Sequence, residues 1–427
     1  METIAEYDIS IQNERHLYLD ILYWGILGGS TISFLGIFLA RTGATNFQLS
    51  LVSAGPALVS LLFSIPAGRY LEARSFVRTT YITSILHRGG YVLMLVGMLI
   101  FAQDLHVTMI LTVTVLMSVP GTVLMIGFNA AFAELVAPDR RGLVVGRRNA
   151  LLAVSMTASA LISGQLLDWI AFPLNYQIVF GIGILGGLLS SYELGRLKGI
   201  PAGTPVPRVG RPILDHARPG RVGLPWARRY VPGTRFLTRG IDALRPDLLR
   251  GEFGVFLGAM FFFYVAQNIV VPLFPIYQVD TMALSDSAIS IGTAVFQVTV
   301  FATSMQLGRL TQRFGHHHLM VVSVLGYACF PLFIGLQPTV SSYMAGAAVG
   351  GIGWGILGGA LANRLMERVP EDDRPSHMAL FNIVLNLGVL CGSLLGPLSG
   401  DLLGVREALV VGGSLRLISS LVLWRWG

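Results

Sequence analysis

Charged residues are scarce in this chain of 427 residues: Asp, Glu, Lys and Arg make up 12% of it, against about 25% in soluble domains. Hydrophobic residues make up 53%. Only two cysteines occur, Cys329 and Cys391, and both stand inside apolar segments. Two buried, hydrophobic thiols are therefore expected rather than a disulfide or a redox centre. The composition excludes an ordinary soluble domain.

The motifs of several protein classes are also missing. No Gly-rich phosphate-binding loop occurs, which argues against ATP-driven transport by this chain. The sequence shows no arrangement of a nucleophile and a base that would predict an enzyme, and no cofactor is expected. We interpret His316-His317-His318 as an ordinary loop rather than a metal site. Residues 1–16 are polar and acidic, so no removable signal peptide is expected. The net charge of +7 predicts contact with anionic lipid rather than with nucleic acid.

Long uncharged segments, by contrast, are abundant. A helix needs about 20 mostly apolar residues to cross the ~30 Å hydrocarbon core of a bilayer. Backbone groups in lipid must be bonded within the segment, so the segments predict an all-α membrane protein. Twelve helices are expected, at residues 17–40, 47–67, 78–101, 107–135, 143–168, 174–195, 252–276, 286–308, 318–336, 340–366, 376–400 and 404–425.

The basic residues are distributed unequally between the two sides of these helices. Of the 30 Lys and Arg residues, 24 fall in the loops on one side, and only Arg41 and Arg406 fall in the loops on the other. Lys and Arg are retained on the cytoplasmic side of a membrane. The sequence therefore predicts a multi-pass protein of the cell membrane with cytoplasmic N- and C-termini.

The segment at 196–251 divides the predicted helices into two groups of six. It carries eleven Arg, and seven Pro fall within 201–232, so it cannot span a membrane. We expect an N-terminal half at 1–195, a basic, Pro-rich cytoplasmic linker at 196–251 and a C-terminal half at 252–427. Within the linker, an amphipathic helix near 234–249 and a flexible chain are both open alternatives.

Polar residues indicate that the two halves are repeats. Four of them recur at an offset of 233 residues, and others recur at an offset of 240, as loops of slightly different length would produce. Parallel six-helix repeats are a known plan of transporters. The repeated pairs are Glu134 and Glu367, Arg141 and Arg374, Asn149 and Asn382, Asp168 and Asp401, then Ser50 and Ser290, Gly68 and Gly308, Arg69 and Arg309.

Two kinds of motif carry a resemblance to a known family. The segment Ile65-Pro-Ala-Gly-Arg69 resembles the loop 2–3 signature of the major facilitator superfamily, and Gly308-Arg-Leu-Thr-Gln-Arg-Phe-Gly-His316 resembles its second copy. The first copy lacks the usual Asp and the closing Gly. Glu134-x6-Arg141 and Glu367-x6-Arg374 resemble the paired motifs after helices 4 and 10. The resemblance implies the major facilitator fold and secondary transport by alternating access.

The same motifs imply a cytoplasmic gate. Glycine lets helices approach closely, and the basic side chains are expected to pair with the acidic ones in the state closed to the cytoplasm. The alternative is that these are solvated loop charges, whose pairs are worth only ~0–1 kcal/mol. The expected gating residues are Gly68, Arg69, Glu134, Arg141, Gly308, Arg309, Glu367 and Arg374.

In the family that this sequence resembles, helices 1, 4, 7 and 10 line a central cavity. Buried amides cost free energy unless they are paired, so Gln267 and Asn268 in mid-span are the sharpest candidates for substrate binding. Bonding between helices is the alternative. Arg88 either points into the cavity and attracts an anionic substrate or extends to the inner surface. The expected substrate-binding residues are Gln267, Asn268, Tyr264, Trp24, Trp354 and Arg88.

The acidic residues bear on coupling. No carboxylate lies in the middle of a predicted span, and Asp20 is the nearest candidate for a proton relay. Because sugar-porter signatures are missing, we favour proton-coupled efflux of amphipathic compounds. The alternatives are an uptake symporter or uniporter of a sugar-like or anionic metabolite, and a non-transporting receptor or lipid-handling protein. The expected partners are a small-molecule substrate, a proton and membrane lipids, and the chain is expected to be a monomer.

Overall fold

The computed structural model describes residues 2–72, 74–199, 246–370 and 374–427. The regular structure in this part of the chain is helical, and twelve helices there are long and apolar enough to cross a membrane. The predicted fold class is confirmed in this respect. Most of the predicted linker, at 200–245, lies outside the described residues.

The N-terminal half begins with a helix whose middle is wound more loosely. Its parts are α1 (Glu2–Leu27), a π-helical turn η1 (Gly28–Ile32) and α2 (Ser33–Arg41). The hydroxyl of Ser75 accepts a hydrogen bond from the backbone N–H of Arg78 and so caps α4. The remaining helices are α3 (Asn46–Glu72), α4 (Phe76–Ile100), α5 (Gln103–Leu135), α6 (Pro138–Trp169) and α7 (Leu174–Gly195).

In the C-terminal half, the first crossing is interrupted by a break, whereas the sequence predicts one continuous helix at 252–276. After a short turn η3 (Pro246–Arg250), helix α10 runs from Glu252 to Val270. Pro272 lacks the N–H that would continue the helix, and α11 (Leu273–Ile276) and η4 (Tyr277–Thr281) complete the crossing. The remaining helices are α12 (Asp286–Phe314), α13 (His316–Leu336), α14 (Val340–Arg368), α15 (Arg374–Leu403) and α16 (Val405–Trp426).

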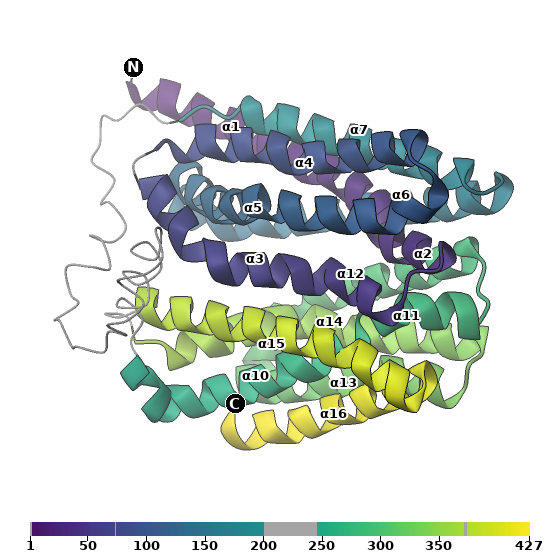
Figure 1. Cartoon of the computed structure of the whole chain (residues 1–427). Coiled ribbons are helices and arrows are strands. Elements are labelled where there is room, and N and C mark those ends of the chain that lie inside the picture. The colour runs from purple at the N-terminus through teal and green to yellow at the C-terminus, as the bar shows by residue number, and fades with distance from the viewer. Residues whose placement is uncertain (1, 73, 200–245, 371–373) are drawn as a thin grey trace, which may run out of the picture.

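Figure 1 shows the two halves as two bundles, with α1–α7 above and α10–α16 below. We call the end of the bundles at residues 199 and 246 the linker end, and the opposite end, at residues 41–46 and 281–286, the distal end. Across the interface, α3 packs on α15 and α6 packs on α12. In each half these are the second and the fifth membrane-spanning helices. The second helix of each half packs on the fifth helix of the other half.

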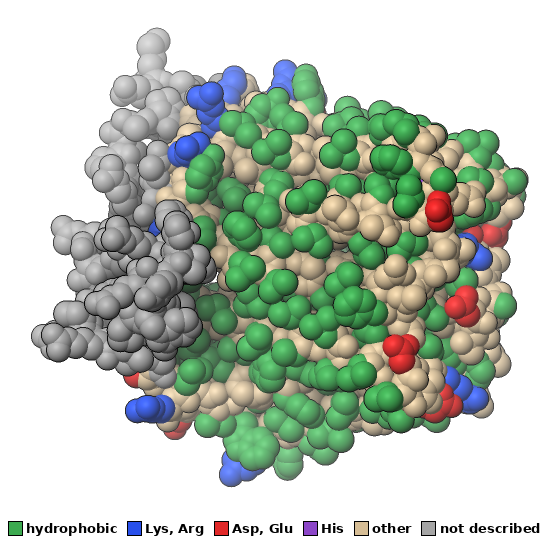
Figure 2. All heavy atoms as spheres, in the orientation of Figure 1, with side chains coloured by type: hydrophobic (Ala, Val, Ile, Leu, Met, Phe, Trp, Pro, Cys, Tyr) green, Lys and Arg blue, Asp and Glu red, His purple; other side chains and the backbone are tan. Residues whose placement is uncertain are grey.

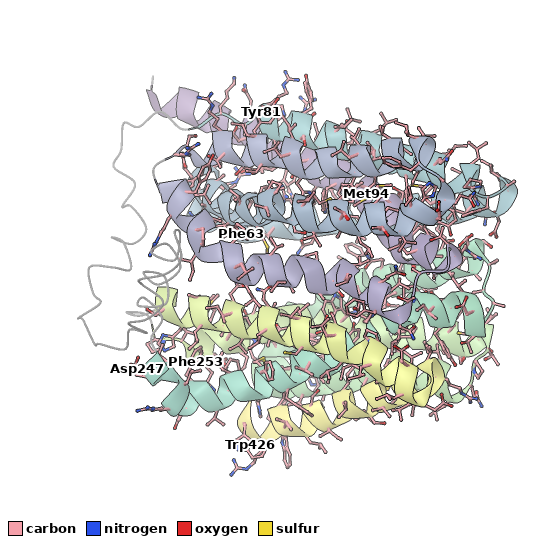
Figure 3. All side chains as sticks on the ribbon, in the orientation of Figure 1. Phe63, Tyr81, Met94, Asp247, Phe253 and Trp426 are labelled. Atoms are coloured by element: carbon pink, nitrogen blue, oxygen red, sulfur yellow. The ribbon has the colours of Figure 1, made fainter. Side chains whose placement is uncertain are left out.

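The apolar core is shared between the halves at one end only. At the distal end, one apolar cluster contains Phe38 and Tyr176 of the N-terminal half together with Tyr277 and Tyr343 of the C-terminal half. At the linker end, the described residues form separate clusters, one within each half. Figure 3 shows Met94 toward the distal end, in the shared cluster, and Phe253 at the linker end, in the cluster of the C-terminal half.

The surface has an apolar belt between the two ends. On the face in Figure 2, hydrophobic side chains cover the middle of the molecule, Lys and Arg gather at the linker end, and most acidic side chains lie toward the distal end. Large apolar side chains are widely exposed in the belt, such as Leu116 at 65% and Met125 at 69%. Such a surface suits lipid rather than water, so this is a multi-pass membrane protein.

Candidate functional site

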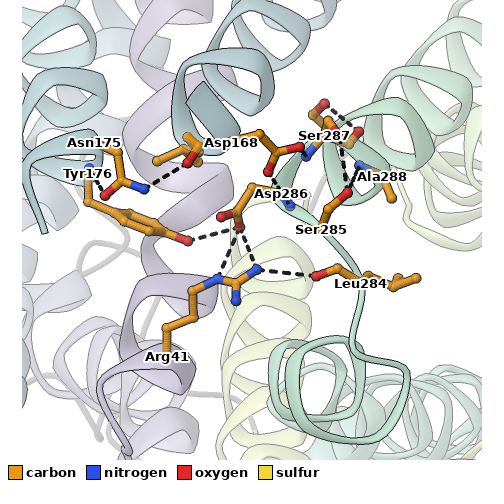
Figure 4. Close-up of polar contacts among 11 residues, drawn as sticks. Arg41, Asp168, Asn175, Tyr176, Leu284, Ser285, Asp286, Ser287 and Ala288 are labelled. Atoms are coloured by element: carbon orange, nitrogen blue, oxygen red, sulfur yellow. Dashed lines mark hydrogen bonds and ion pairs between the residues drawn. The ribbon is translucent and has the colours of Figure 1, made fainter. Parts of the chain in front are cut away.

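The distal end is closed by a buried carboxylate that joins the two halves (Figure 4). Asp286, at the start of α12, is 5% exposed. Its Oδ1 accepts hydrogen bonds from Arg41 Nη2 at 3.1 Å and from the Tyr176 hydroxyl at 3.0 Å. Arg41 Nη2 also donates to the carbonyl of Leu284 at 3.2 Å. The side chain of Asp286 is 7% exposed and that of Arg41 is 28% exposed. The pair is therefore partly shielded from water, which strengthens it relative to a fully exposed pair, and it fastens α2 and α7 to the C-terminal half.

A second carboxylate reaches across the same interface. Asp168, at the end of α6, accepts hydrogen bonds from the backbone N–H groups of Asp286 and Ser287 at 3.1 and 3.3 Å. A negative charge at a helix N-terminus is favourable because the first N–H groups of a helix lack partners within it. The N-terminal half therefore caps α12 of the C-terminal half. We call Arg41, Asp168, Tyr176 and Asp286 the distal cluster.

The C-terminal half makes the reciprocal contact. Asp401, near the end of α15, accepts a hydrogen bond of 2.6 Å from Asn46, the first residue of α3. Asp168 and Asp401 are one of the repeated pairs found in the sequence. The structure thus gives this repeat a physical role, because each aspartate ties the end of a helix in its own half to the start of a helix in the other half.

Farther from the distal end, the halves are joined by Ser53 and Ser393, whose hydroxyls lie 2.9 Å apart, and by Gln297, which donates to the sulfur of Met156 at 3.4 Å. At the linker end, no hydrogen bond or ion pair joins the halves among the described residues. The contacts across the interface therefore thin out from the distal end toward the linker end.

A cavity of about 960 Å³ adjoins the distal cluster. Arg41 and Tyr176 line it, together with Asp168, Asp280 and Asp286. The cavity opens at the distal surface, and its lining contains more acidic than basic side chains. None of the predicted substrate-binding residues lines it.

Within the N-terminal half, the structure brings Asp20 between two arginines from different helices. Asp20 accepts hydrogen bonds from Arg148 Nη2 at 3.2 Å and from the Ser190 hydroxyl at 2.6 Å. Arg88 Nη2 donates to Ser190 Oγ at 2.8 Å and lies 3.9 Å from Asp20. The side chains of Asp20 and Arg88 are both 5% exposed. We call Asp20, Arg88, Arg148 and Ser190 the N-half charge cluster.

Two of the predicted substrate-binding residues belong to this region. Arg88 points neither to the linker-end surface nor to solvent, because it is held between α1 and α7. Its guanidinium lies 4.9 Å from the ring centroid of Trp24, which in turn lies 6.2 Å from the ring of His87. Nε and Nη1 of Arg88 are buried without a hydrogen-bond partner among the described residues.

In the C-terminal half, an arginine that was not among the predicted site residues occupies the middle of the bundle. Arg416 on α16 is 0% exposed. Its Nη2 donates to the backbone carbonyl of Gln267 at 2.7 Å, and its guanidinium lies 4.5 Å from the ring centroid of Tyr327. Nε and Nη1 lack partners, and no carboxylate pairs with Arg416 in the described part of the chain.

Arg416 connects predicted residues that lie on different helices. The rings of Tyr327 and of Trp354 on α14 pack at a tilt with their centroids 5.0 Å apart, so Trp354 and Gln267 are linked through Tyr327 and Arg416. The side-chain oxygen of Gln267 is buried without a partner among the described residues. Asn268 donates to the carbonyl of Tyr264 in its own helix at 2.8 Å. The structure therefore places a bonded and an unbonded amide side by side.

The predicted gating residues lie at the linker end without the pairs expected of a closed gate. Arg141 donates to the carbonyls of Val136 and Ala133, at the end of α5, rather than to Glu134. Glu367 pairs with Arg364 at 2.9 Å and lies 3.8 Å from His316. The side chain of Arg374 lies outside the described residues.

The motif glycines and their neighbouring arginines are also unengaged in this state. A Cβ atom built on Gly68 or Gly308 would meet nothing within 4 Å. Arg69 and Arg309 form no ion pair with a carboxylate of the described segments. The close helix approach expected at these glycines is thus not made in this conformation, and the pairing of the gate remains a prediction.

Sequence reasoning missed Arg41, Tyr176 and Asp286 as functional residues. Their partners are far apart in the chain: Arg41 and Asp286 are 245 residues apart. One signal was present, since Arg41 is one of two basic residues on its side of the membrane. The repeated pair of Asp168 and Asp401 was a second signal.

Comparisons with known proteins agree with this architecture. The chain matches the profile of the Major Facilitator Superfamily over residues 21–234 and 256–427. Among solved structures, a D-xylose-proton symporter superposes with a TM-score of 0.68 at 14% identity, covering 98% of this chain and 97% of that one. A bacterial homologue of the iron transporter ferroportin, in an inward-facing state, gives 0.68 at 13% identity, covering 97% and 98%.

Curated relatives match over shorter stretches. A class H tetracycline resistance protein of Pasteurella multocida is 27% identical over 121 residues, which is 28% of this chain and 30% of that protein. Multidrug resistance protein MdtG of Citrobacter koseri is 29% identical over 168 residues, or 37% and 39% of the two chains. The aligned part thus spans well under half the length of these relatives. With a profile match over both halves and the same fold, the chain belongs to the Major Facilitator Superfamily of membrane transporters.

Proposed function

We propose that this protein is a secondary transporter that works by alternating access and exports amphipathic organic compounds in exchange for protons. The observation that carries the proposal is the uneven interface between the halves. An apolar cluster and the distal cluster join them at one end, whereas each half has its own apolar cluster at the other. This is the arrangement expected of one state of a protein whose halves rock about a central site.

In this proposal the linker end is cytoplasmic, because the loops there carry 24 of the 30 basic residues. The structure then corresponds to the state open to the cytoplasm. Closure of the linker end would bring Gly68 and Gly308 against the facing helices and let Arg69 and Arg309 pair with Glu134 and Glu367.

Export is supported by the relatives. Two curated proteins that match parts of this chain are named for resistance to tetracycline and to multiple drugs. The predicted site is also partly aromatic, with Trp24, Tyr264 and Trp354, as is suited to an amphipathic ligand. Asp20, which forms ion pairs with Arg148 and Arg88, is the candidate coupling residue.

One observation favours a second candidate, the transport of an organic anion. The N-half charge cluster has two arginines for one carboxylate, and Arg416 has no carboxylate among the described residues. Both lie within the bundle, where an unpaired charge is costly. An anionic substrate would supply the missing negative charge.

Flux into proteoliposomes separates the two candidates. The purified protein is reconstituted, a pH gradient is imposed, and the movement of tetracycline, a lipophilic cationic dye and benzoate is measured. The export proposal expects movement of tetracycline or the dye that is driven by the gradient and abolished by a protonophore. Movement of benzoate alone would favour the second candidate, and movement of no probe under any gradient would contradict both.

The gate is tested separately with Glu134→Gln and Glu367→Gln. Each variant removes a partner for the motif arginines in the closed state, so labelling of cysteines introduced at the linker end should increase. Glu407→Gln is the matched control because Glu407 is an exposed glutamate at the distal end. Unchanged labelling and unchanged transport in both variants would contradict the gating role.

A further inference from the structure

A groove opens on the surface of the N-terminal half where α3 is joined to α4, at the linker end. Its volume is about 470 Å³, and residues from Tyr70 to Leu86 line it. It is separate from the distal cluster and from the predicted substrate-binding residues. Neither the proposed transport cycle nor the gate uses it.

The part of the groove nearest the linker end is basic. Arg74 and Arg78 line it and are both exposed, and neither forms an ion pair with a carboxylate in the described part of the chain. Tyr70 holds Arg74 in place: the guanidinium lies 4.0 Å from the ring centroid, and Nη1 donates to the hydroxyl at 2.6 Å. Arg78 lies in the first turn of α4, a helix of 25 residues, whose free N–H groups add to the positive potential.

The part of the groove farther along α4, away from the linker end, is apolar. Ile82 and Leu86 follow Arg78 at intervals of four residues, so the three side chains share one face of α4. Ile82 is 45% exposed and Leu86 is 58% exposed. Leu86 lies about 12 Å farther along the helix than Arg78. The face therefore begins with two cations at the edge of the membrane-spanning region and continues as an apolar strip into it.

The C-terminal half does not repeat the two arginines of this groove. At the offset of 240 residues that relates Gly68 to Gly308, Arg74 corresponds to Phe314 and Arg78 corresponds to His318. The helix boundary is kept, since α13 begins at His316 as α4 begins at Phe76. The two arginines are thus a property of this groove rather than of the repeated motif.

We propose that this groove binds an anionic phospholipid. The phosphate group lies between Arg74 and Arg78, and an acyl chain lies along Ile82 and Leu86. Charge complementarity accounts for the basic part, and a lipid is the anionic ligand that also covers the apolar strip, which a free phosphate leaves bare. Guanidinium groups bind phosphate through directed, charge-assisted hydrogen bonds.

Native mass spectrometry of the full-length protein tests the proposal. The detergent-solubilised protein is mixed with phosphatidylglycerol or with phosphatidylcholine of the same acyl chains, and the retained lipid is counted. Wild type should retain phosphatidylglycerol preferentially. The double variant Arg74→Gln/Arg78→Gln should weaken this binding about 25-fold, because each basic residue near a membrane surface contributes roughly a factor of five. Arg74→Lys/Arg78→Lys should retain most of it.

A matched control removes the same charge elsewhere. Arg313 and Arg425 are exposed at the linker end of the C-terminal half, and each lies over an aromatic ring as Arg74 does. Arg313→Gln/Arg425→Gln should leave phosphatidylglycerol binding unchanged, and an equal loss there would overturn the proposal in favour of non-specific attraction. Leu86→Glu should weaken binding with both arginines intact.

The headgroup alone is the last arm. Glycerol phosphate should bind far more weakly than the lipid, because it cannot use the apolar strip. Equal binding of glycerol phosphate and the lipid, or equal retention of phosphatidylcholine and phosphatidylglycerol, would contradict the assignment. None of these measurements depends on transport, so their failure is distinct from a failure of the proposed function.

Discussion

The two halves share one helix plan but treat buried charge in opposite ways. In the N-terminal half, Asp20 neutralises arginines from α4 and α6, and Ser190 bridges it to Arg88. In the C-terminal half, Arg416 has a backbone carbonyl and an aromatic ring as its neighbours, with no carboxylate among the described residues. The first arrangement binds helices to one another. The second leaves a cation whose negative partner has still to be supplied.

The distal end shows both the symmetry of the repeat and its limit. Asp168 and Asp401 make reciprocal contacts between the halves, as their equivalent positions suggest. Only the side of Asp168 adds the buried contact among Arg41, Tyr176 and Asp286. The repeat thus accounts for the two reciprocal contacts, and the additional bonds of Asp286 to Arg41 and Tyr176 account for the difference between them.

The largest expected effect is that of Asp20→Asn. The variant leaves two buried guanidinium groups without a counter-charge, and removing one partner of a buried ion pair costs about 3–5 kcal/mol. The melting temperature in detergent should fall sharply. Asp104→Asn is the control, because Asp104 is exposed at the distal start of α5. Similar melting temperatures for the two variants would show that the N-half charge cluster does not stabilise the fold.

Arg416→Met should change the melting temperature in the opposite direction from Asp20→Asn, or not at all. Replacing a buried ion pair by apolar residues of similar volume is often neutral or stabilising, by about 1–4 kcal/mol, and Arg416 has no carboxylate partner among the described residues to leave unpaired. The melting temperature should therefore stay the same or rise. If Arg416 serves an anionic substrate, flux of benzoate should fall at the same time. A marked loss of stability would show instead that Arg416 is a structural residue like Arg88.

The unequal distal contacts predict unequal effects of Asp286→Asn and Asp401→Asn. Charged hydrogen bonds contribute about 1.5–3 kcal/mol each and neutral ones about 0.5–1.5 kcal/mol. Asp286→Asn should raise labelling of cysteines at the distal end by about tenfold, which corresponds to roughly 1.4 kcal/mol. Asp401→Asn only weakens a single exposed hydrogen bond, because the Asn oxygen can still accept from Asn46, and it should change labelling much less. The reverse order would refute the ranking.

The smallest effects are expected at the two amides of α10. Gln267→Ala removes a side chain with an unbonded oxygen, so substrate affinity should fall while the melting temperature changes little. Asn268→Ala removes its hydrogen bond to the Tyr264 carbonyl, so the melting temperature should fall slightly. For scale, a side-chain hydrogen bond between helices is worth about 0.6 kcal/mol in membrane bundles. If neither variant alters substrate affinity, the binding role of this pair is wrong.

Much of the fold followed from the sequence. Twelve spans were predicted from apolar length, and twelve helices of the described part are long enough to cross a membrane. Several boundaries were misplaced. Helix α12 runs to Phe314 rather than to residue 308, because its last residues are polar but still helical and the positive φ of Gly315 ends it. The break after Val270 was also missed, although Pro272 stands there.

The site was less predictable than the fold. Trp24 and Arg88 were predicted together and do lie together, and Gln267 and Trp354 are linked only through Arg416 and Tyr327. Arg416 was not among the predicted site residues, yet it is fully buried. Depth along a helix can be counted from the sequence, whereas the direction of a side chain depends on how each helix is rotated.

The sequence by itself determined the number of membrane spans, the uneven distribution of basic loops and the internal repeat, because apolar length and charge are properties of each segment alone. Tertiary structure decided which charges meet. Asp20 contacts Arg148 across 128 residues and Arg41 contacts Asp286 across 245. Neighbouring positions on a helix differ by about 100° in direction, so only the packing and rotation of the helices bring such pairs within bonding distance, and only the packing of the halves closes one end of the protein.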